Sequence, residues 1–177
     1  MRKIWIPFVS LALAAVLLLG LYNGLQGVRQ ANREKELNEK MMTLLPGSTT
    51  FAEEAYTGED TNIAAIYKGE TGYVVETTTA GYAGPIRMLV GVNNDGQVTG
   101  LQVRSMEETF GLGAEALTDW KFLAQFLRTE GEVAVGTDID AISGATVTSK
   151  AITRSVNSAV AFVTGADVSS GATSWGG

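Results

Sequence analysis

Four hydroxyl side chains gathered around one glycine are the residues of this sequence best suited to chemistry. Residues 140–150 read DAISGATVTSK, with Ser143 before Gly144 and with Thr146, Thr148 and Ser149 after it. A helix is expected to begin here, and its first turn would offer unpaired N–H groups and a partial positive charge, which together favour a phosphate. Gly144 and Ala145 would let the backbone approach such a ligand closely. The stretch therefore predicts a phosphate site, although plain helix capping is the commoner role of such hydroxyls.

The composition of the chain excludes several kinds of cofactor and partner. The sequence has no Cys and no His, which excludes disulfides, iron–sulfur clusters, c-type haem attachment and the usual zinc sites. Its formal net charge of -6 repels phosphate backbones, so nucleic acid is a poor partner. We predict no metal site and no catalytic acid or base, and any redox centre would be organic or would belong to a neighbouring protein.

The elements expected to position the hydroxyl stretch form one α+β domain over residues 46–165, with a mainly antiparallel sheet. Short strands are predicted in NIAAIYKG and GYVVETTTA, and residues 86–92 alternate before an Asp95-Gly96 turn, which indicates a hairpin. Thr118 is the expected N-cap of a helix. The spacing of its apolar stripe predicts core positions for Trp120, Leu123, Ala124 and Leu127. Gly165 is expected to end the last helix, and residues 166–177 to form a flexible tail.

An uncharged run near the N-terminus predicts a membrane anchor over residues 1–28. Residues 4–22 read IWIPFVSLALAAVLLLGLY, and a helix of that length, rising about 1.5 Å per residue, nearly matches a hydrocarbon core of about 30 Å. The alternative is a cleaved signal peptide, but the run is long for one and no good cleavage site follows it. Flanking charges leave the orientation open. Residues 29–45 then predict a charged, solvated helical stalk that Leu45-Pro46-Gly47 ends.

Three motifs in the expected order resemble those of the FMN-binding family that includes the G subunit of the Rnf electron-transport complex and the C subunit of the sodium-pumping NADH:quinone reductase. DAISGAT at 140–146 is similar to the flavinylation motif of that family. GYAGPI, which opens residues 81–103, resembles its Gly-Tyr-x-Gly-Pro-Ile hairpin, and ETFGLG at 108–113 resembles its Glu-Thr-Pro-Gly-Leu-Gly loop. With the N-terminal segment, the resemblance covers roughly residues 1–163, and the short length is more typical of the Rnf subunit.

The resemblance implies FMN joined through its phosphate to the Thr146 hydroxyl. Because that hydroxyl is a poor nucleophile and the chain has no His to activate it, a separate flavin transferase with FAD as donor is expected to attach it. Asp140 would serve either recognition by the transferase or a turn in the backbone. The other cofactor-binding residues that we predict are Ser143, Gly144, Ala145 and Thr148 near the phosphate, and Glu108, Thr109, Gly111, Leu112 and Gly113 near the flavin ring.

The sequence also departs from the family pattern. Phe110 replaces the usual Pro, which loosens the loop, and the His that commonly precedes the loop is missing, which removes a polar contact. Neither departure touches the attachment motif. A second match, DVSSGAT at 167–173, places Thr173 at an acceptor position, and we expect it to stay unmodified because no helix follows it.

The role that the resemblance implies is that of an electron-carrier subunit in a membrane-bound, ion-translocating Rnf-type ferredoxin:NAD oxidoreductase complex. A single span of the inner (cell) membrane would place the flavin domain on the periplasmic or extracellular side. The expected partners are other subunits, including membrane subunits and a second flavinylated subunit, together with the flavin transferase and membrane lipid. Two alternatives remain: a stand-alone, membrane-anchored extracytoplasmic flavoprotein or FMN-carrying reductase, and an anchored binding domain in which the hydroxyls only cap a helix.

Overall fold

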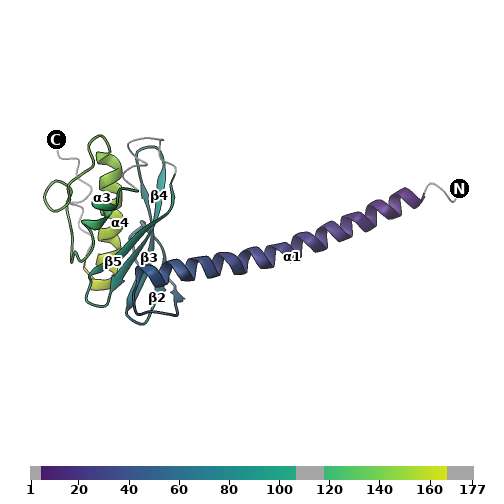
Figure 1. Cartoon of the computed structure of the whole chain (residues 1–177), viewed down its shortest axis with the longest axis horizontal. Helices are drawn as coiled ribbons and strands as arrows, with labels where there is room; N and C mark the ends of the chain where they lie inside the picture. Colours follow the sequence, from purple (N-terminus) through teal and green to yellow (C-terminus); the bar gives the residue numbers. More distant parts are fainter. Residues whose placement is uncertain (1–4, 107–117, 167–177) are drawn as a thin grey trace. The chain divides into compact units, whose positions relative to one another are not determined.

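The computed structural model describes residues 5–106 and 118–166 (Figure 1). Its elements, in chain order, are α1 (Trp5–Leu44), β1 (Ala52–Glu54), β2 (Ile63–Lys68), β3 (Gly72–Ala80), β4 (Pro85–Asn93), β5 (Val98–Met106), α3 (Trp120–Ala124) and α4 (Thr146–Thr164). The chain divides into two compact units, residues 1–39 and residues 40–177. The predicted tail and the 108–113 loop lie outside the described residues.

The first unit is the greater part of helix α1. Its polar half carries pairs four residues apart on the exposed surface, Gln30 with Glu34 and Lys35 with Glu39, a spacing that supports an isolated helix. Within the described residues, no helix is both long and apolar enough to cross a membrane. The expected anchor therefore stays a prediction.

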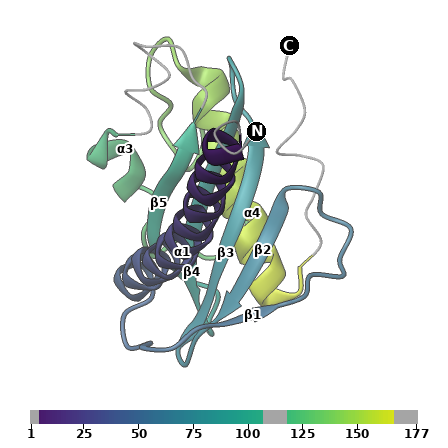
Figure 2. The same cartoon turned by 90° about the vertical axis from the view of Figure 1, so that its right-hand side faces the viewer.

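The second unit is built on a five-stranded sheet in which every strand pairs antiparallel with its neighbour in the sequence, in the order β1-β2-β3-β4-β5 (Figure 2). The β4–β5 hairpin turns at the predicted Asp95-Gly96, where Gly96 has a φ of 84°. Asn93 stabilises the turn, because its side-chain oxygen accepts from the N–H groups of Asp95 at 3.0 Å and Gln97 at 2.8 Å. The prediction of an α+β domain with a mainly antiparallel sheet is confirmed.

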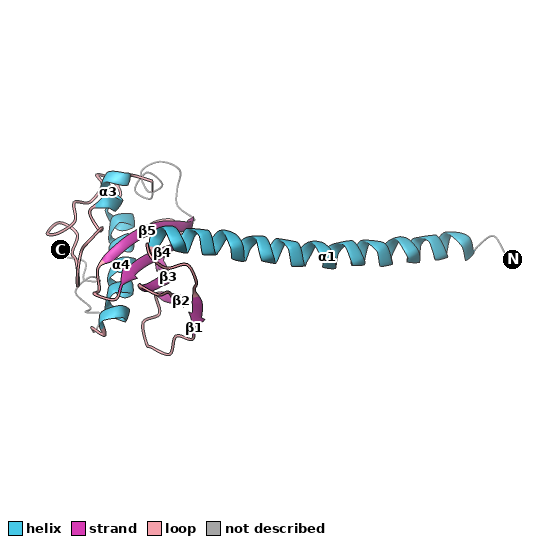
Figure 3. Cartoon of the chain, turned by 60° about the horizontal axis from the view of Figure 1, so that its bottom comes forward, coloured by secondary structure: helices cyan, strands magenta, loops and turns pink. Residues whose placement is uncertain are grey.

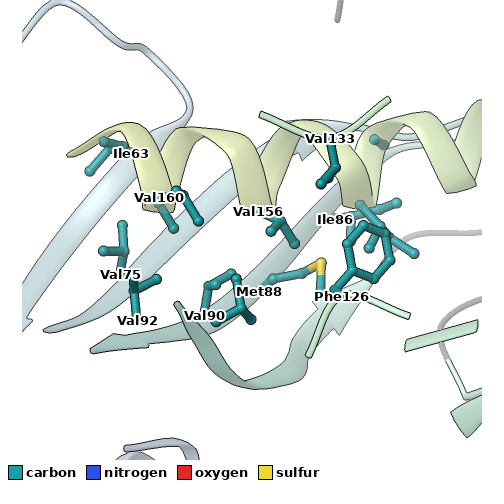
Figure 4. Close-up of a cluster of buried hydrophobic side chains, with 14 of the residues drawn as sticks. Ile63, Val75, Ile86, Met88, Val90, Val92, Phe126, Val133, Val156 and Val160 are labelled. Carbon is teal, nitrogen blue, oxygen red and sulfur yellow. The ribbon is translucent and has the colours of Figure 1, made fainter. Parts of the chain in front are cut away.

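Helix α4 covers one face of this sheet and closes the main core. Figure 4 shows the apolar side chains that meet there, which come from α4, from the strands and from the segment after α3: Ile63, Val75, Ile86, Met88, Val90, Val92, Phe126, Val133, Val156 and Val160. Alternate residues of β4 point to α4, as the pattern over 86–92 predicts. Each fully buried side chain of this kind stabilises the fold by roughly 1.5–3 kcal/mol, so the apolar face of α4 holds the helix on the sheet.

The prediction for α3 is wrong in two respects. Its N-cap is Asp119, not Thr118, because the Asp119 carboxylate accepts from the N–H groups of Lys121 at 2.8 Å and Phe122 at 3.3 Å. The predicted apolar stripe is also only partly right: Leu123 packs against the core, but Trp120 is 71% exposed and Leu127 is 44% exposed, whereas Phe122 and Phe126 are buried with their rings edge to face at 5.4 Å. Phe122 and Phe126 are four positions apart, so the face that meets the core is theirs and not the one that carries Trp120 and Leu127.

A pair of glycines receives the end of α1 on the other face of the sheet. Gly91 of β4 lies opposite Gly100 of β5, and a Cβ at Gly91 would come within 2.3 Å of the Leu44 carbonyl oxygen. The Thr99 hydroxyl donates to the same oxygen at 2.6 Å. Residues 41, 44 and 45 are buried there. The last turn of α1 thus needs a surface without side chains at this point, which explains glycine in the middle of a strand.

We predict that Gly91→Ala destabilises the domain by about 1–3 kcal/mol, because the added methyl group would have to displace backbone atoms of Leu44. Denaturant unfolding of the wild type and the variant measures the difference. Gly27→Ala in α1 is the control, since a Cβ there meets nothing within 4 Å, and it should cause no loss. Equal stability of Gly91→Ala and wild type would contradict the close approach.

Candidate functional site

The predicted phosphate site lies at the first turn of α4. Helix α4 begins at Thr146, its N-cap is Ala145, and no side chain of the described residues caps it. The expected capping of this helix by one of the hydroxyls is therefore not found. Thr146 is exposed, as are Ser143 and Gly144 before it. The unpaired N–H groups of this turn and an exposed hydroxyl thus occur together at one helix end.

A tight turn sets the backbone in front of the helix. The Ala145 N–H donates to the Ile142 carbonyl at 2.9 Å, and Gly144 between them has a φ of 79°. A positive φ at the third residue of such a turn favours glycine, which gives Gly144 of the motif a conformational role. The turn places Ser143 and Gly144 at the surface and directs the chain into α4 at Thr146.

The other two hydroxyls of the stretch face inward. Ser149 is fully buried, and its hydroxyl donates to the Ala145 carbonyl at 3.0 Å and accepts from the Ile142 N–H at 3.3 Å. It therefore closes the turn from inside the helix. Thr148 is 1% exposed, so its backbone N–H is better placed than its hydroxyl to meet a phosphate beyond the helix end. Its assignment as a cofactor contact stays a prediction.

The backbone of Asp140 is held by a residue that the sequence did not suggest. The Gln125 side chain, just after α3, accepts from the Asp140 N–H at 2.8 Å and donates to the Asp140 carbonyl at 3.3 Å. The Asp140 carboxylate itself is exposed and makes no hydrogen bond within the described parts of the chain. The expected turn-ordering role of that carboxylate finds no support, and the local order comes from Gln125 instead.

A second amide holds the start of the same segment. Asn157, buried on α4, accepts from the Val133 N–H at 3.1 Å and donates to the Val133 carbonyl at 2.9 Å. Between these two clamps the Asp138 carboxylate accepts from the Ala134 N–H at 2.8 Å. The segment that leads to Thr146 is drawn mostly as loop in Figure 3, yet side chains of α4 and of the segment after α3 hold its backbone at both ends.

The structure thus brings together Asp140, Ser143, Gly144, Ala145, Thr146 and Thr148, all of them predicted, around one helix end. The predicted ring contacts Glu108, Thr109, Gly111, Leu112 and Gly113 lie outside the described residues, as does Thr173. Gln125, Ser149 and Asn157 are the residues whose roles were missed. No local pattern marks Gln125 or Asn157, because each pairs with backbone 15 or 24 positions away.

We predict that Gln125→Leu raises the amide hydrogen-exchange rate of Asp140 by roughly 5- to 100-fold, because two hydrogen bonds worth about 0.5–1.5 kcal/mol each are lost. Exchange followed by NMR measures the rate. Gln102→Leu, a change of the same kind on β5, is the control and should leave Asp140 as in the wild type. Unaltered exchange in Gln125→Leu would show that the amide does not order this backbone.

Comparison with known proteins agrees with the motifs. The family described as FMN-binding domain matches residues 81–161. The G subunit of the ion-translocating oxidoreductase complex of Methanosarcina acetivorans is 34% identical over 168 residues, covering 86% of this chain and 88% of that protein.

Two further relatives match over a shorter range. The G subunit of the Na(+)-translocating ferredoxin:NAD(+) oxidoreductase complex of Acetobacterium woodii is 41% identical over 98 residues, covering 50% of this chain and 47% of that protein. The G subunit of the proton-translocating ferredoxin:NAD(+) oxidoreductase complex of Clostridium ljungdahlii is 40% identical over 99 residues, covering 52% and 53%. These two alignments span about half of each relative.

Proposed function

The chain belongs to the family of G subunits of ion-translocating oxidoreductase complexes, and on this basis we propose that it carries FMN and transfers electrons within such a complex. The observation that carries the proposal is the exposed Thr146 hydroxyl at the first residue of an α4 helix that has no side-chain cap. A flavin phosphate bound there would meet the N–H groups and the positive end of the helix dipole.

The residues around Thr146 fit a covalently held flavin phosphate. Attachment would form a bond between the Thr146 oxygen and the phosphorus of the FMN half of FAD. The pyrophosphate bond would break, AMP would leave, and the hydroxyl proton would pass to a base of the flavin transferase. Ser143, Gly144 and Ala145 would border the phosphate, with the Thr148 N–H beneath it. Bound FMN supplies the redox chemistry, and this chain supplies its position and electrostatic surroundings.

We predict that the chain coexpressed with a flavin transferase gains the mass of one FMN, less one water, and that Thr146→Ala abolishes the gain because no acceptor oxygen remains. Intact-protein mass spectrometry measures it. Thr146→Ser should keep the flavin, and Thr173→Ala should keep it too, which separates the two motif copies. An FMN mass on Thr146→Ala would refute attachment at Thr146, and two FMN masses on the wild type would refute the unmodified tail.

The proposed assembly follows the relatives, whose names describe ion-translocating complexes. Ferredoxin and NAD(+) appear in the names of the Acetobacterium and Clostridium proteins. The same names differ in the ion, Na(+) in one and a proton in the other, so we propose no ion for this chain. Other subunits of the complex, including membrane subunits and a second flavinylated subunit, would be its partners.

We predict that residues 4–22 anchor the chain in the inner membrane with the flavin domain on the outer side. The stretch carries no charge, so its insertion costs no charge burial. The full chain should stay with the membrane pellet after alkaline carbonate washing, and protease added to spheroplasts should cut its domain. A variant that lacks residues 1–28 should be released as the matched control. Release of the full chain by carbonate would contradict the anchor.

A further inference from the structure

The tip of the β3–β4 hairpin carries an aromatic side chain in an unusual setting. The tip is closed by the Gly81 N–H, which donates to the Gly84 carbonyl at 2.9 Å, and Tyr82 between them is 75% exposed. Most residues of the two strands below it are buried. Over the described residues 40–106 and 118–166, only Tyr82 and Trp120 are exposed aromatic side chains.

The hairpin tip and the first turn of α4 lie at the same end of the domain. Near the end of β3, the buried Thr79 hydroxyl donates to the Ala151 carbonyl of α4 at 3.1 Å and hydrogen-bonds the Ser155 hydroxyl at 3.0 Å. From this link β3 continues to the tip while α4 runs back to Thr146. Figures 1 and 2 both show the tip of the hairpin beside the start of α4.

Trp120, the other exposed aromatic side chain, is less well placed than Tyr82 to meet a flavin at Thr146. It lies at the start of α3, and the link to the attachment segment, from Gln125 to Asp140, follows the end of that helix. Figure 2 shows α3 beyond β5, the edge strand, whereas the hairpin of β3 and β4 lies at the start of α4. The two exposed aromatics therefore differ in their position relative to Thr146, which makes Trp120 a matched comparison for Tyr82.

We propose that Tyr82 is a stacking platform for the isoalloxazine ring of the flavin held at Thr146. The inference rests on the proposed attachment. A ring joined to the protein only through a flexible ribityl phosphate is free to sweep over the surface around the first turn of α4. An exposed phenol ring on the hairpin tip at the same end of the domain offers a flat aromatic partner, and aromatic stacking favours the paired state roughly two- to tenfold. One face of the flavin would then lie on Tyr82, and the other would stay open to an electron-transfer partner.

Flavin fluorescence tests the proposal, because a phenol in contact with an excited isoalloxazine quenches it by electron transfer. The full chain is coexpressed with a flavin transferase, and intact mass establishes the FMN content of each variant. Tyr82→Leu should raise the fluorescence yield per bound flavin severalfold and lower its anisotropy, since both the quencher and the platform are lost. Tyr82→Trp should stay quenched, and Trp120→Leu should match the wild type.

The outcomes separate this inference from the attachment on which it rests. A fully loaded Tyr82→Leu variant with wild-type yield and anisotropy would overturn the stacking and leave the attachment intact. A higher fluorescence yield in Trp120→Leu without one in Tyr82→Leu would overturn stacking on Tyr82 and would place the flavin ring on the α3 side instead. A wild-type chain without an FMN mass would overturn both. Loss of fold does not confuse the result, because Tyr82 is 75% exposed and circular dichroism of each variant reports the fold.

Discussion

The position of the attachment segment depends on how α4 lies against the sheet. Apolar contacts hold the helix there, but apolar packing alone tolerates sliding along a face. The buried hydrogen bonds of Thr79 with the Ala151 carbonyl and the Ser155 hydroxyl are directional, and each would be costly to leave unpaired. They fix α4 along β3 and so fix the end of the helix that carries Thr146. Without that register the clamp of Asn157 on Val133, which begins the segment, would not form.

The elements that were predictable are those whose signal is local. The alternation over 86–92 and the Asp95-Gly96 turn became a strand and a hairpin as predicted, and Gly165 ends α4 as predicted. The stripe through Trp120 and Leu127 failed because the face that packs on the core carries Phe122 and Phe126 instead, and apolar spacing alone did not decide between the two faces. The hydrogen bonds of Gln125 and Asn157 could not be predicted from the sequence, because each joins residues that only the folded chain brings together.

Burial divides one run of hydroxyl residues into two roles that the sequence could not separate. Ser149 turns inward and closes the backbone turn, whereas Thr146 stays exposed at the first position of α4. The type of residue is nearly the same at both positions. What differs is the place on the helix: Ser149 is three positions after Thr146 and its hydroxyl reaches back to the Ala145 carbonyl, while Thr146, as the first helical residue, has no earlier helical turn whose carbonyl its hydroxyl could bond. The motif therefore combines a backbone turn, an inward hydroxyl that hydrogen-bonds that turn and an outward hydroxyl that stays exposed.

A carrier makes different demands on a protein from an enzyme, and this domain meets those of a carrier. An enzyme needs acids, bases or metals around an enclosed substrate, whereas a carrier needs a cofactor held at a defined place and left accessible. The segment around Thr146 combines a backbone held by three side chains with an exposed threonine at its end. A rigid base with a short flexible tether would limit the flavin to one end of the domain and still let it meet donors and acceptors in turn. A domain of this kind would suit the proposed transfer of electrons between neighbouring redox centres.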